Sequence, residues 1–97
     1  MTFSKQLNEN EFTLTVAGRL DALSAPQIEA EVEAIPEGVT LLVFDFSALD
    51  YVSSAGLRVI LMGIKKVENV KVLNPTECVN EVLEMTGFSD MLEIVNS

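Results

Sequence analysis

One segment constrains the fold of this chain more than any other: the almost unbroken apolar run Val39–Phe46, with the sequence Val-Thr-Leu-Leu-Val-Phe-Asp-Phe. Its residues are rich in β-branched and aromatic types, which favour a pleated, extended backbone. An extended segment that is apolar at nearly every position is typical of a strand with both faces covered. The run therefore predicts the central strand of a sheet.

The residues before this strand predict a β-hairpin. Two segments, Phe3–Leu7 and Phe12–Val16, alternate apolar with polar side chains, which is the period of a strand with one buried face. The turn-forming residues Asn8–Asn10 separate them. We therefore expect two antiparallel strands at the start of the chain.

A first helix is expected between the hairpin and the central strand. Ser24 is the expected N-cap, Pro26 lies in the first turn, and Pro36 and Gly38 end the segment. Its expected inner face consists of Ile28, Val32 and Ile35. A second helix is expected to begin near Ser54, because apolar residues then recur at helical spacing. These residues are Leu57, Ile60, Leu61 and Ile64.

The C-terminal third predicts a strand, a helix and a last strand. A short strand at Val70–Leu73 precedes Asn74, the expected N-cap, Pro75, the expected first helical residue, and Glu77, which would complete a capping box. The expected inner face of this helix consists of Val79, Val82, Leu83 and Thr86. Gly87 is expected to end the helix in a left-handed conformation, before a strand at Met91–Val95.

The resulting order, β-β-α-β-α-β-α-β, predicts an α/β fold with a mostly parallel sheet of about five strands and three crossover helices. The chain has 97 residues, of which 48% are hydrophobic, so we expect one domain over residues 1–97. No apolar stretch approaches the roughly 20 residues needed to span a bilayer, and the N-terminus has no signal-peptide pattern. A cytoplasmic location is therefore expected.

Charge and residue types exclude several classes of function. Six basic and fifteen acidic residues give a net charge of −9, which disfavours nucleic-acid partners and anionic membrane surfaces. The chain has no histidine and a single cysteine, so we expect no disulfide, no metal site and no cofactor, with Cys78 packed in the interior. Its five glycines are dispersed, so no phosphate-binding loop is expected either.

The segment Asp45–Leu57 carries the most informative chemistry. It is expected to leave the central strand, pass through a loop and enter a helix with Ser53 and Ser54 at its start, where unpaired N–H groups would accommodate a phosphate. The alternative is that one of these serines is only an N-cap. A nucleophilic serine lacks a histidine or Ser-x-x-Lys partner. Asp45 and Asp50 are interpreted as turn formers rather than catalytic acids.

Three motifs together resemble the STAS domain of bacterial anti-sigma factor antagonists. They are Gly18-Arg-Leu-Asp21, the segment Asp45–Leu57, and Asn74-Pro75 with Val82–Phe88. The resemblance covers nearly the whole chain, with the motifs in the right order. Arg58 departs from it, because that position is often held by a small residue in the family.

The resemblance implies partner switching without catalysis. An unphosphorylated antagonist binds an anti-sigma factor that is also a serine kinase and so releases a sigma factor. Phosphorylation breaks that complex, and a phosphatase of the metal-dependent PP2C type resets it. The modified residue maps onto Ser54, with Ser53 as the alternative, and a monomer is favoured.

The surface that would contact the partner is expected to include Asp21, Asp45, Asp50, Tyr51, Val52, Ser53, Ser54, Gly56, Leu57 and Arg58. The alternative function is a non-phosphorylated STAS interaction module, such as a lipid-transporter subunit or a stressosome-type scaffold.

Overall fold

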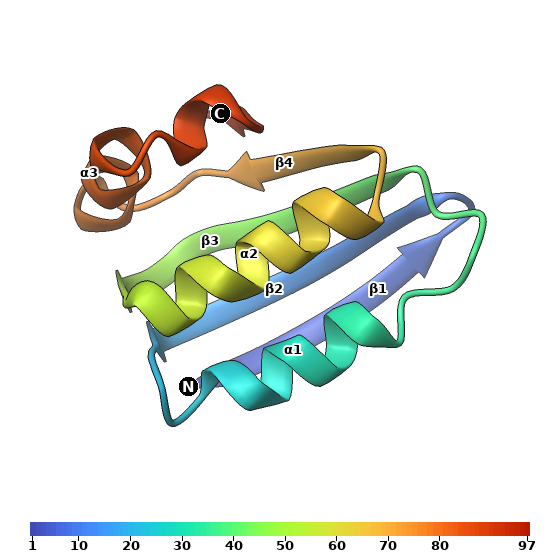
Figure 1. The fold of residues 1–97 in the computed structure, drawn as a ribbon, viewed down its shortest axis with the longest axis horizontal. Helices are drawn as coiled ribbons and strands as arrows, with labels where there is room; N and C mark the ends of the chain where they lie inside the picture. The colour runs from blue at the N-terminus through green and yellow to red at the C-terminus, as the bar shows by residue number, and fades with distance from the viewer.

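The chain forms a five-stranded sheet whose strands lie side by side in sequence order, β1-β2-β3-β4-β5 (Figure 1). The structure is a computed structural model that describes all residues from 1 to 97. Its elements are β1 Thr2–Asn8, β2 Glu11–Leu20, α1 Ala25–Glu33, β3 Leu41–Val52, α2 Ser54–Lys66, β4 Asn69–Leu73, α3 Glu77–Met85, the short 3-10 helix η1 Phe88–Asp90, and β5 Glu93–Val95. β1 is antiparallel to β2 and all other pairs are parallel. The expected element order, the hairpin and the central position of β3 are confirmed.

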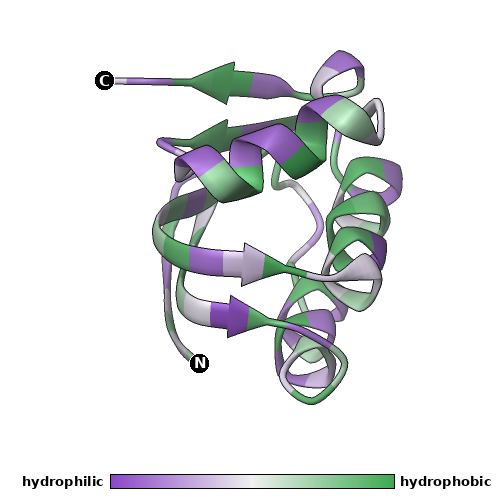
Figure 2. Cartoon of the chain, turned by 90° about the vertical axis from the view of Figure 1, so that its left-hand side faces the viewer, coloured by the Kyte–Doolittle hydropathy of each residue, from purple (hydrophilic) through white to green (hydrophobic).

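Both long helices lie on one face of the sheet. Each parallel strand is added on the same side of the one before, and crossovers of this kind are right-handed, so α1 and α2 reach the same face. Figure 2 shows that no helix covers the opposite face. In β2, Leu14 and Val16 are accordingly buried, whereas Thr13 and Thr15 are only partly covered. The prediction that both faces of the central strand are covered therefore holds at Val43, which is 9% exposed, but not at Leu41 and Asp45, which are half-buried on the face without helices.

α2 packs against the sheet through its glycines. Its buried residues are Gly56, Val59, Ile60 and Gly63. Of the predicted stripe only Ile60 is fully buried, and the others are half-buried. A methyl group on Gly63 would lie 2.7 Å from Leu42 Cδ2, so the helix can approach β3 this closely only because that position has no side chain. The face of α2 that contacts the sheet is therefore centred on the glycines, and the larger apolar residues Leu57, Leu61 and Ile64 lie at its margins.

The start of α3 differs from the prediction. The helix begins at Glu77, with Thr76 in the N-cap position and no side-chain cap, and residues 74–75 precede it. Asn74 has a φ of 50° and its Oδ1 accepts a hydrogen bond of 2.7 Å from the Ser97 N–H. The Thr76 hydroxyl donates to the Leu49 carbonyl at 2.7 Å. Asn74 and Thr76 thus bind distant parts of the chain in place of the first turn, and the predicted capping box does not form.

α3 buries a narrower face than its sequence suggests. Val79 and Leu83 are buried, but Cys78 is exposed, so its predicted place in the interior is wrong. Thr86 is also exposed, and its hydroxyl donates to the Val82 carbonyl at 2.7 Å. α3 contacts the rest of the molecule on one side only, beside β3 and η1. Its length and that of the other helices fall short of what crossing a membrane requires.

Candidate functional site

The second half of β3 contains two bulges that shape the site. Residues on β2 and β3 pair in register up to Thr15 and Asp45, after which β3 has an extra residue before Ala48 and another before Tyr51. The bulges change the burial period, so Phe46, Leu49 and Val52 are the buried residues of this half. The segment predicted to be a loop is therefore strand as far as Val52.

Asp45 braces the first bulge and lies away from the two serines. Its Oδ1 accepts hydrogen bonds from the Ser47 N–H at 3.1 Å and from the Ser47 hydroxyl at 2.8 Å. Six strand residues, a distance of roughly 20 Å, separate it from Val52 at the end of β3. The sheet thus does not bring Asp45 to the candidate site. Asp50 lies within the strand, exposed, and close to its end.

A single residue, Ser53, connects β3 to α2. Its N–H donates to the Leu20 carbonyl at 2.9 Å, and its carbonyl accepts the first helical hydrogen bond, from the Leu57 N–H at 2.9 Å. Gly56 permits this tight junction, because a methyl group there would lie 2.6 Å from Val52 Cγ2 and 2.8 Å from the Leu20 carbonyl oxygen. The ends of β2 and β3 and the start of α2 therefore meet at one point.

The two adjacent serines have different environments. Ser53 occupies the N-cap position without a side-chain capping bond, and its Oγ is buried with no hydrogen-bond partner. Ser54 is the first residue of α2 and is exposed. The N–H groups of the first turn have no side-chain acceptor, so neither serine acts as a cap. Only the Ser54 hydroxyl is accessible from solvent.

Asp21 organises the neighbouring turn between β2 and α1. Its Oδ1 accepts hydrogen bonds from the N–H groups of Leu23 at 3.1 Å and Ser24 at 3.3 Å. The Ser24 hydroxyl donates to the Arg19 carbonyl at 2.8 Å, so the predicted side-chain cap by Ser24 does not form. Because Leu20 pairs with Val52 across the sheet, this turn lies beside the start of α2.

The charge state of Asp21 follows from these contacts. Partial desolvation acts to raise the pKa of Asp21. The N–H groups of Ser24 and Leu23, the Ser24 hydroxyl and the charge of Arg19 outweigh it, so the pKa lies below its ordinary value. Asp21 is therefore ionised at neutral pH and contributes negative charge beside Ser54.

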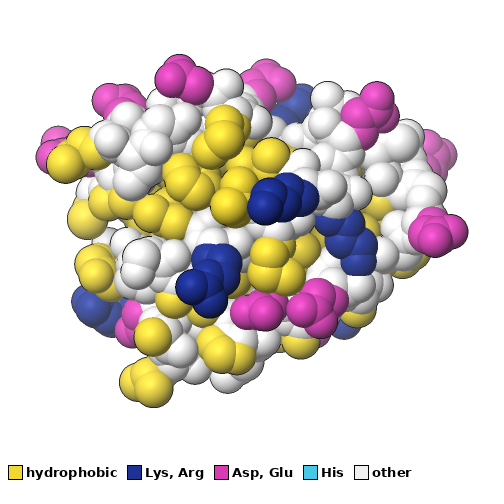
Figure 3. Space-filling view, viewed as in Figure 1, with side chains coloured by type: hydrophobic (Ala, Val, Ile, Leu, Met, Phe, Trp, Pro, Cys, Tyr) yellow, Lys and Arg dark blue, Asp and Glu magenta, His cyan; other side chains and the backbone are white.

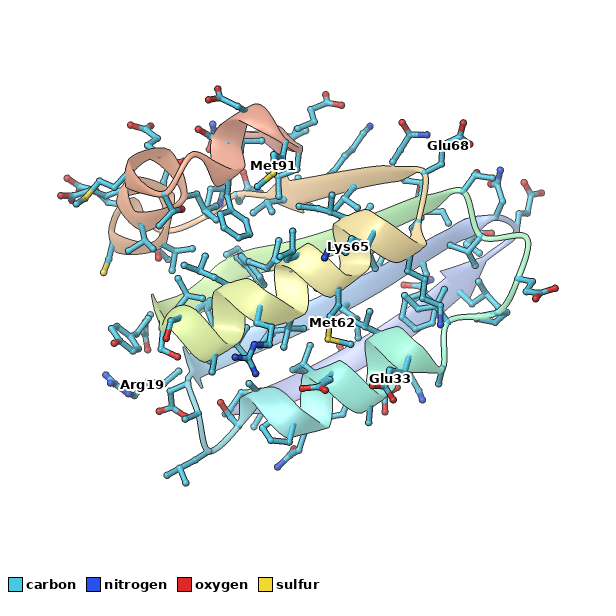
Figure 4. All side chains as sticks on the ribbon, viewed as in Figure 1. Arg19, Glu33, Met62, Lys65, Glu68 and Met91 are labelled. Atoms are coloured by element: carbon cyan, nitrogen blue, oxygen red, sulfur yellow. The ribbon has the colours of Figure 1, made fainter.

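Arg19 connects Asp21 to Tyr51. Its Nε lies 3.8 Å from Asp21 Oδ2, and its guanidinium carbon lies 4.2 Å from the centre of the Tyr51 ring, a cation–π contact. Figure 4 shows Arg19 projecting at the same end of the molecule as the start of α2. Arg19 was not among the predicted site residues, although its position in the Gly18–Asp21 motif was a signal. Leu23, which is 91% exposed beside Asp21, was not predicted either.

The remaining predicted site residues fall into two groups, those whose side chains reach the surface and those that are buried beneath it. Tyr51 and Leu57 are half-buried and Arg58 is exposed, so their side chains reach the surface. Val52 is 3% exposed and Gly56 is buried, so these two shape the surface from beneath. On the helical face of the molecule, hydrophobic and basic side chains gather along the middle, with acidic side chains above and below them (Figure 3).

Comparisons with known proteins agree on one family. A family model described as the STAS domain matches residues 2–97. A protein of Bordetella bronchiseptica named as an anti-sigma factor antagonist, BtrV, is 38% identical over 87 residues, which cover 82% of this chain and 73% of that protein.

Solved structures share the fold. The anti-sigma factor antagonist SpoIIAA in its unphosphorylated form has a TM-score of 0.86 at 22% identity, covering 99% of this chain and 88% of that one. The Bacillus cell-fate determinant SpoIIAA in its phosphorylated form has a TM-score of 0.78 at 21% identity, covering 99% and 91%. At these identities the likeness establishes the architecture.

Proposed function

Since this chain belongs to the STAS domain family, among the anti-sigma factor antagonists, we propose that it controls a sigma factor by partner switching. Unphosphorylated, it binds an anti-sigma factor that is also a serine kinase, and so frees the sigma factor. Phosphorylation of Ser54 breaks the complex. The protein acts by binding alone, in the cytoplasm, as one STAS domain over residues 1–97.

The observation that carries this proposal is the exposure of Ser54 at the start of α2. A kinase needs an accessible hydroxyl, and Ser54 supplies one, whereas the Ser53 Oγ is buried. A phosphate at the start of a helix also meets free N–H groups and the positive end of the helix dipole, so the fold can accept it. The existence of both unphosphorylated and phosphorylated forms of SpoIIAA, which has the same fold, supports phosphorylation as the switch.

Electrostatics supply the switch. A phosphate adds about −1.5 to −2 charges at neutral pH. On this surface it joins Asp21 and the exposed Asp50, in a molecule whose net charge is already −9. Acidic groups of a partner would be repelled, and the dianion would have to be desolvated at the interface. A difference of a few kcal/mol between the two states is enough to exchange partners.

The complete cycle requires two partners. The kinase binds the surface formed by Asp21, Asp50, Tyr51, Leu57 and Arg58, with Leu23 at its margin. A PP2C-type phosphatase removes the phosphate and restores binding. We propose that the protein works as a monomer, because one exposed Ser54 and one contact surface suffice for each exchange.

Phosphorylation by the cognate kinase tests the proposal. The kinase and ATP should add one phosphate to the wild type and to Ser53→Ala, and none to Ser54→Ala, as measured by intact-mass and fragment mass spectrometry. Phosphate found on Ser53 would overturn the site. A complex with the kinase that survives Ser54→Asp unchanged would overturn the switch, and would indicate a non-phosphorylated interaction module.

A further inference from the structure

We infer that Arg58 binds the phosphate carried by Ser54, forming a clamp on the first turns of α2. This inference rests on the proposed phosphorylation and adds to it a residue that holds the modified side chain. It concerns the state of the switch after the phosphate has been transferred.

The helix places the two side chains together. Ser54 is the first residue of α2 and Arg58 follows four positions later, so both lie on one face with Cβ atoms about 5–6 Å apart. Both side chains are exposed. Helical side chains lean toward the N-terminus, so the Arg58 side chain can reach over the turn that contains Ser54. An anion four residues before a cation is also the favourable order on a helix.

Arg58 is free to make this contact. The ion pairs of the molecule are Lys5 with Glu31, Arg19 with Asp21, and Lys71 with Glu93, and none includes Arg58. α2 contains no acidic residue that could compete for the guanidinium.

Other cations are less suited. Arg19 is already paired with Asp21 and stacked on Tyr51. Lys65 lies toward the far end of α2 in Figure 4, about 16 Å along the helix from Ser54. Lys66 donates to the Glu33 carbonyl. Arg58 is therefore the cation of α2 that a phosphate on Ser54 would meet.

The chemistry matches in shape and charge. A planar guanidinium can donate two parallel hydrogen bonds to phosphate oxygens, which a lysine ammonium cannot. Binding would also remove the free positive charge of Arg58 from the contact surface. Phosphorylation would then both add negative charge and withdraw the one cation that α2 presents beside Ser54, which increases the electrostatic contrast between the two states.

Phosphorus NMR of protein with phosphoserine incorporated at position 54 during translation tests the clamp. A nearby cation stabilises the phosphate dianion and lowers its second pKa. We expect that pKa to rise by about half a unit in Arg58→Ala relative to the wild type, with a smaller rise in Arg58→Lys. The matched control, Lys65→Ala, removes one positive charge from the same helix and should leave the pKa unchanged.

If the phosphate has the same pKa in the wild type and in Arg58→Ala, the inference is overturned. It is also overturned if Lys65→Ala raises the pKa as much as Arg58→Ala does, because the effect would then come from the overall charge of the helix and not from a contact with Arg58. Amide NMR spectra of each variant establish that the fold is intact. Because the phosphoserine is installed without a kinase, failure of the kinase to modify Ser54 would refute the proposed function and leave this result standing.

Discussion

Ser53 and Ser54 carry the same side chain and differ only in where the fold directs it. The backbone of Ser53 is bound to Leu20 and Leu57, and its hydroxyl is turned inward, whereas Ser54 faces solvent. Local sequence selects the pair, since both lie at a predicted helix start. It cannot separate them, because burial of the Ser53 Oγ depends on how closely α2 packs on the sheet.

Leu23 should be part of the binding surface without being part of the core. Its side chain is 91% exposed beside Asp21, so Leu23→Ser should leave the melting temperature unchanged. Loss of a leucine contact of about 1.5 kcal/mol should weaken kinase binding by about tenfold, as measured by calorimetry. Leu7→Ser is the matched control, because Leu7 is 52% exposed and pairs with Phe12 at the opposite end of β2. Equal affinities for the wild type and Leu23→Ser would remove Leu23 from the interface.

Ionised Asp21 should stabilise the fold, and this contribution to stability should be lost at acidic pH. Its folded pKa is depressed below 3.8, so its stabilising contribution is complete above that pH and is lost as the pH falls through the folded value. Melting temperatures between pH 5 and pH 2 should therefore fall less steeply in Asp21→Asn than in the wild type. Parallel curves would show that the hydrogen bonds from Leu23 and Ser24 do not favour the ionised form.

α2 shows how an element can be predicted in its extent and missed in its orientation. The apolar spacing identified a helix near Ser54, and the helix is there. The largest apolar residues suggested an inner face containing Leu57 and Ile64, but Gly56 and Gly63 determine the closest approach. A hydrophobic pattern gives glycine no weight, although its lack of a side chain is what permits the contact.

The two glycines should respond differently to alanine. A methyl group at Gly56 would meet a backbone oxygen, Leu20 O, at 2.8 Å, whereas at Gly63 it would meet the end of a flexible side chain, Leu42 Cδ2, at 2.7 Å. Urea unfolding should show that Gly56→Ala lowers the free energy of unfolding by about 2–3 kcal/mol, and that Gly63→Ala has a smaller effect. Lys65→Ala, on the exposed face, should change it little. If Gly56→Ala is as stable as the wild type, α2 does not depend on this close contact.

Most elements could be predicted from the sequence because their signals are local. The alternation of apolar and polar residues predicted the hairpin, the helical spacing of apolar residues predicted three helices, and the apolar run predicted β3. The features that the sequence did not predict depend on contacts between residues that are distant in the chain. The two bulges of β3 arise from its pairing with β2, and Asn74 and Thr76 bind Ser97 and Leu49 in place of capping α3. Cys78 is exposed because α3 is covered on one side only.

The same division applies to the candidate site. Ser54, Asp21, Asp50 and Tyr51 were predicted from motifs and do lie around the start of α2. Asp45, which belongs to the same motif, is separated from them by the second half of β3. Arg19 was missed because its contacts with Asp21 and Tyr51 depend on the register between two strands.

The molecule as a whole combines a large net charge with the small contact surface that we propose around the start of α2. Parallel strands direct the ends of β2 and β3 to one end of the sheet, where α2 begins, so the proposed phosphorylation site and the proposed binding surface coincide. Three of the six basic residues lie on α2, while the net charge is −9. A phosphate at this position would therefore act on a part of the surface where positive and apolar side chains are available to a partner.

Affinity for the cognate kinase, measured without ATP, tests this account most directly. Calorimetry should compare the unphosphorylated protein with protein that carries phosphoserine at position 54. We expect the phosphate to raise the Kd by about 100-fold, which corresponds to roughly 2.7 kcal/mol of differential affinity. The same Kd for both forms would contradict the account, because phosphorylation of Ser54 would then leave the partner bound.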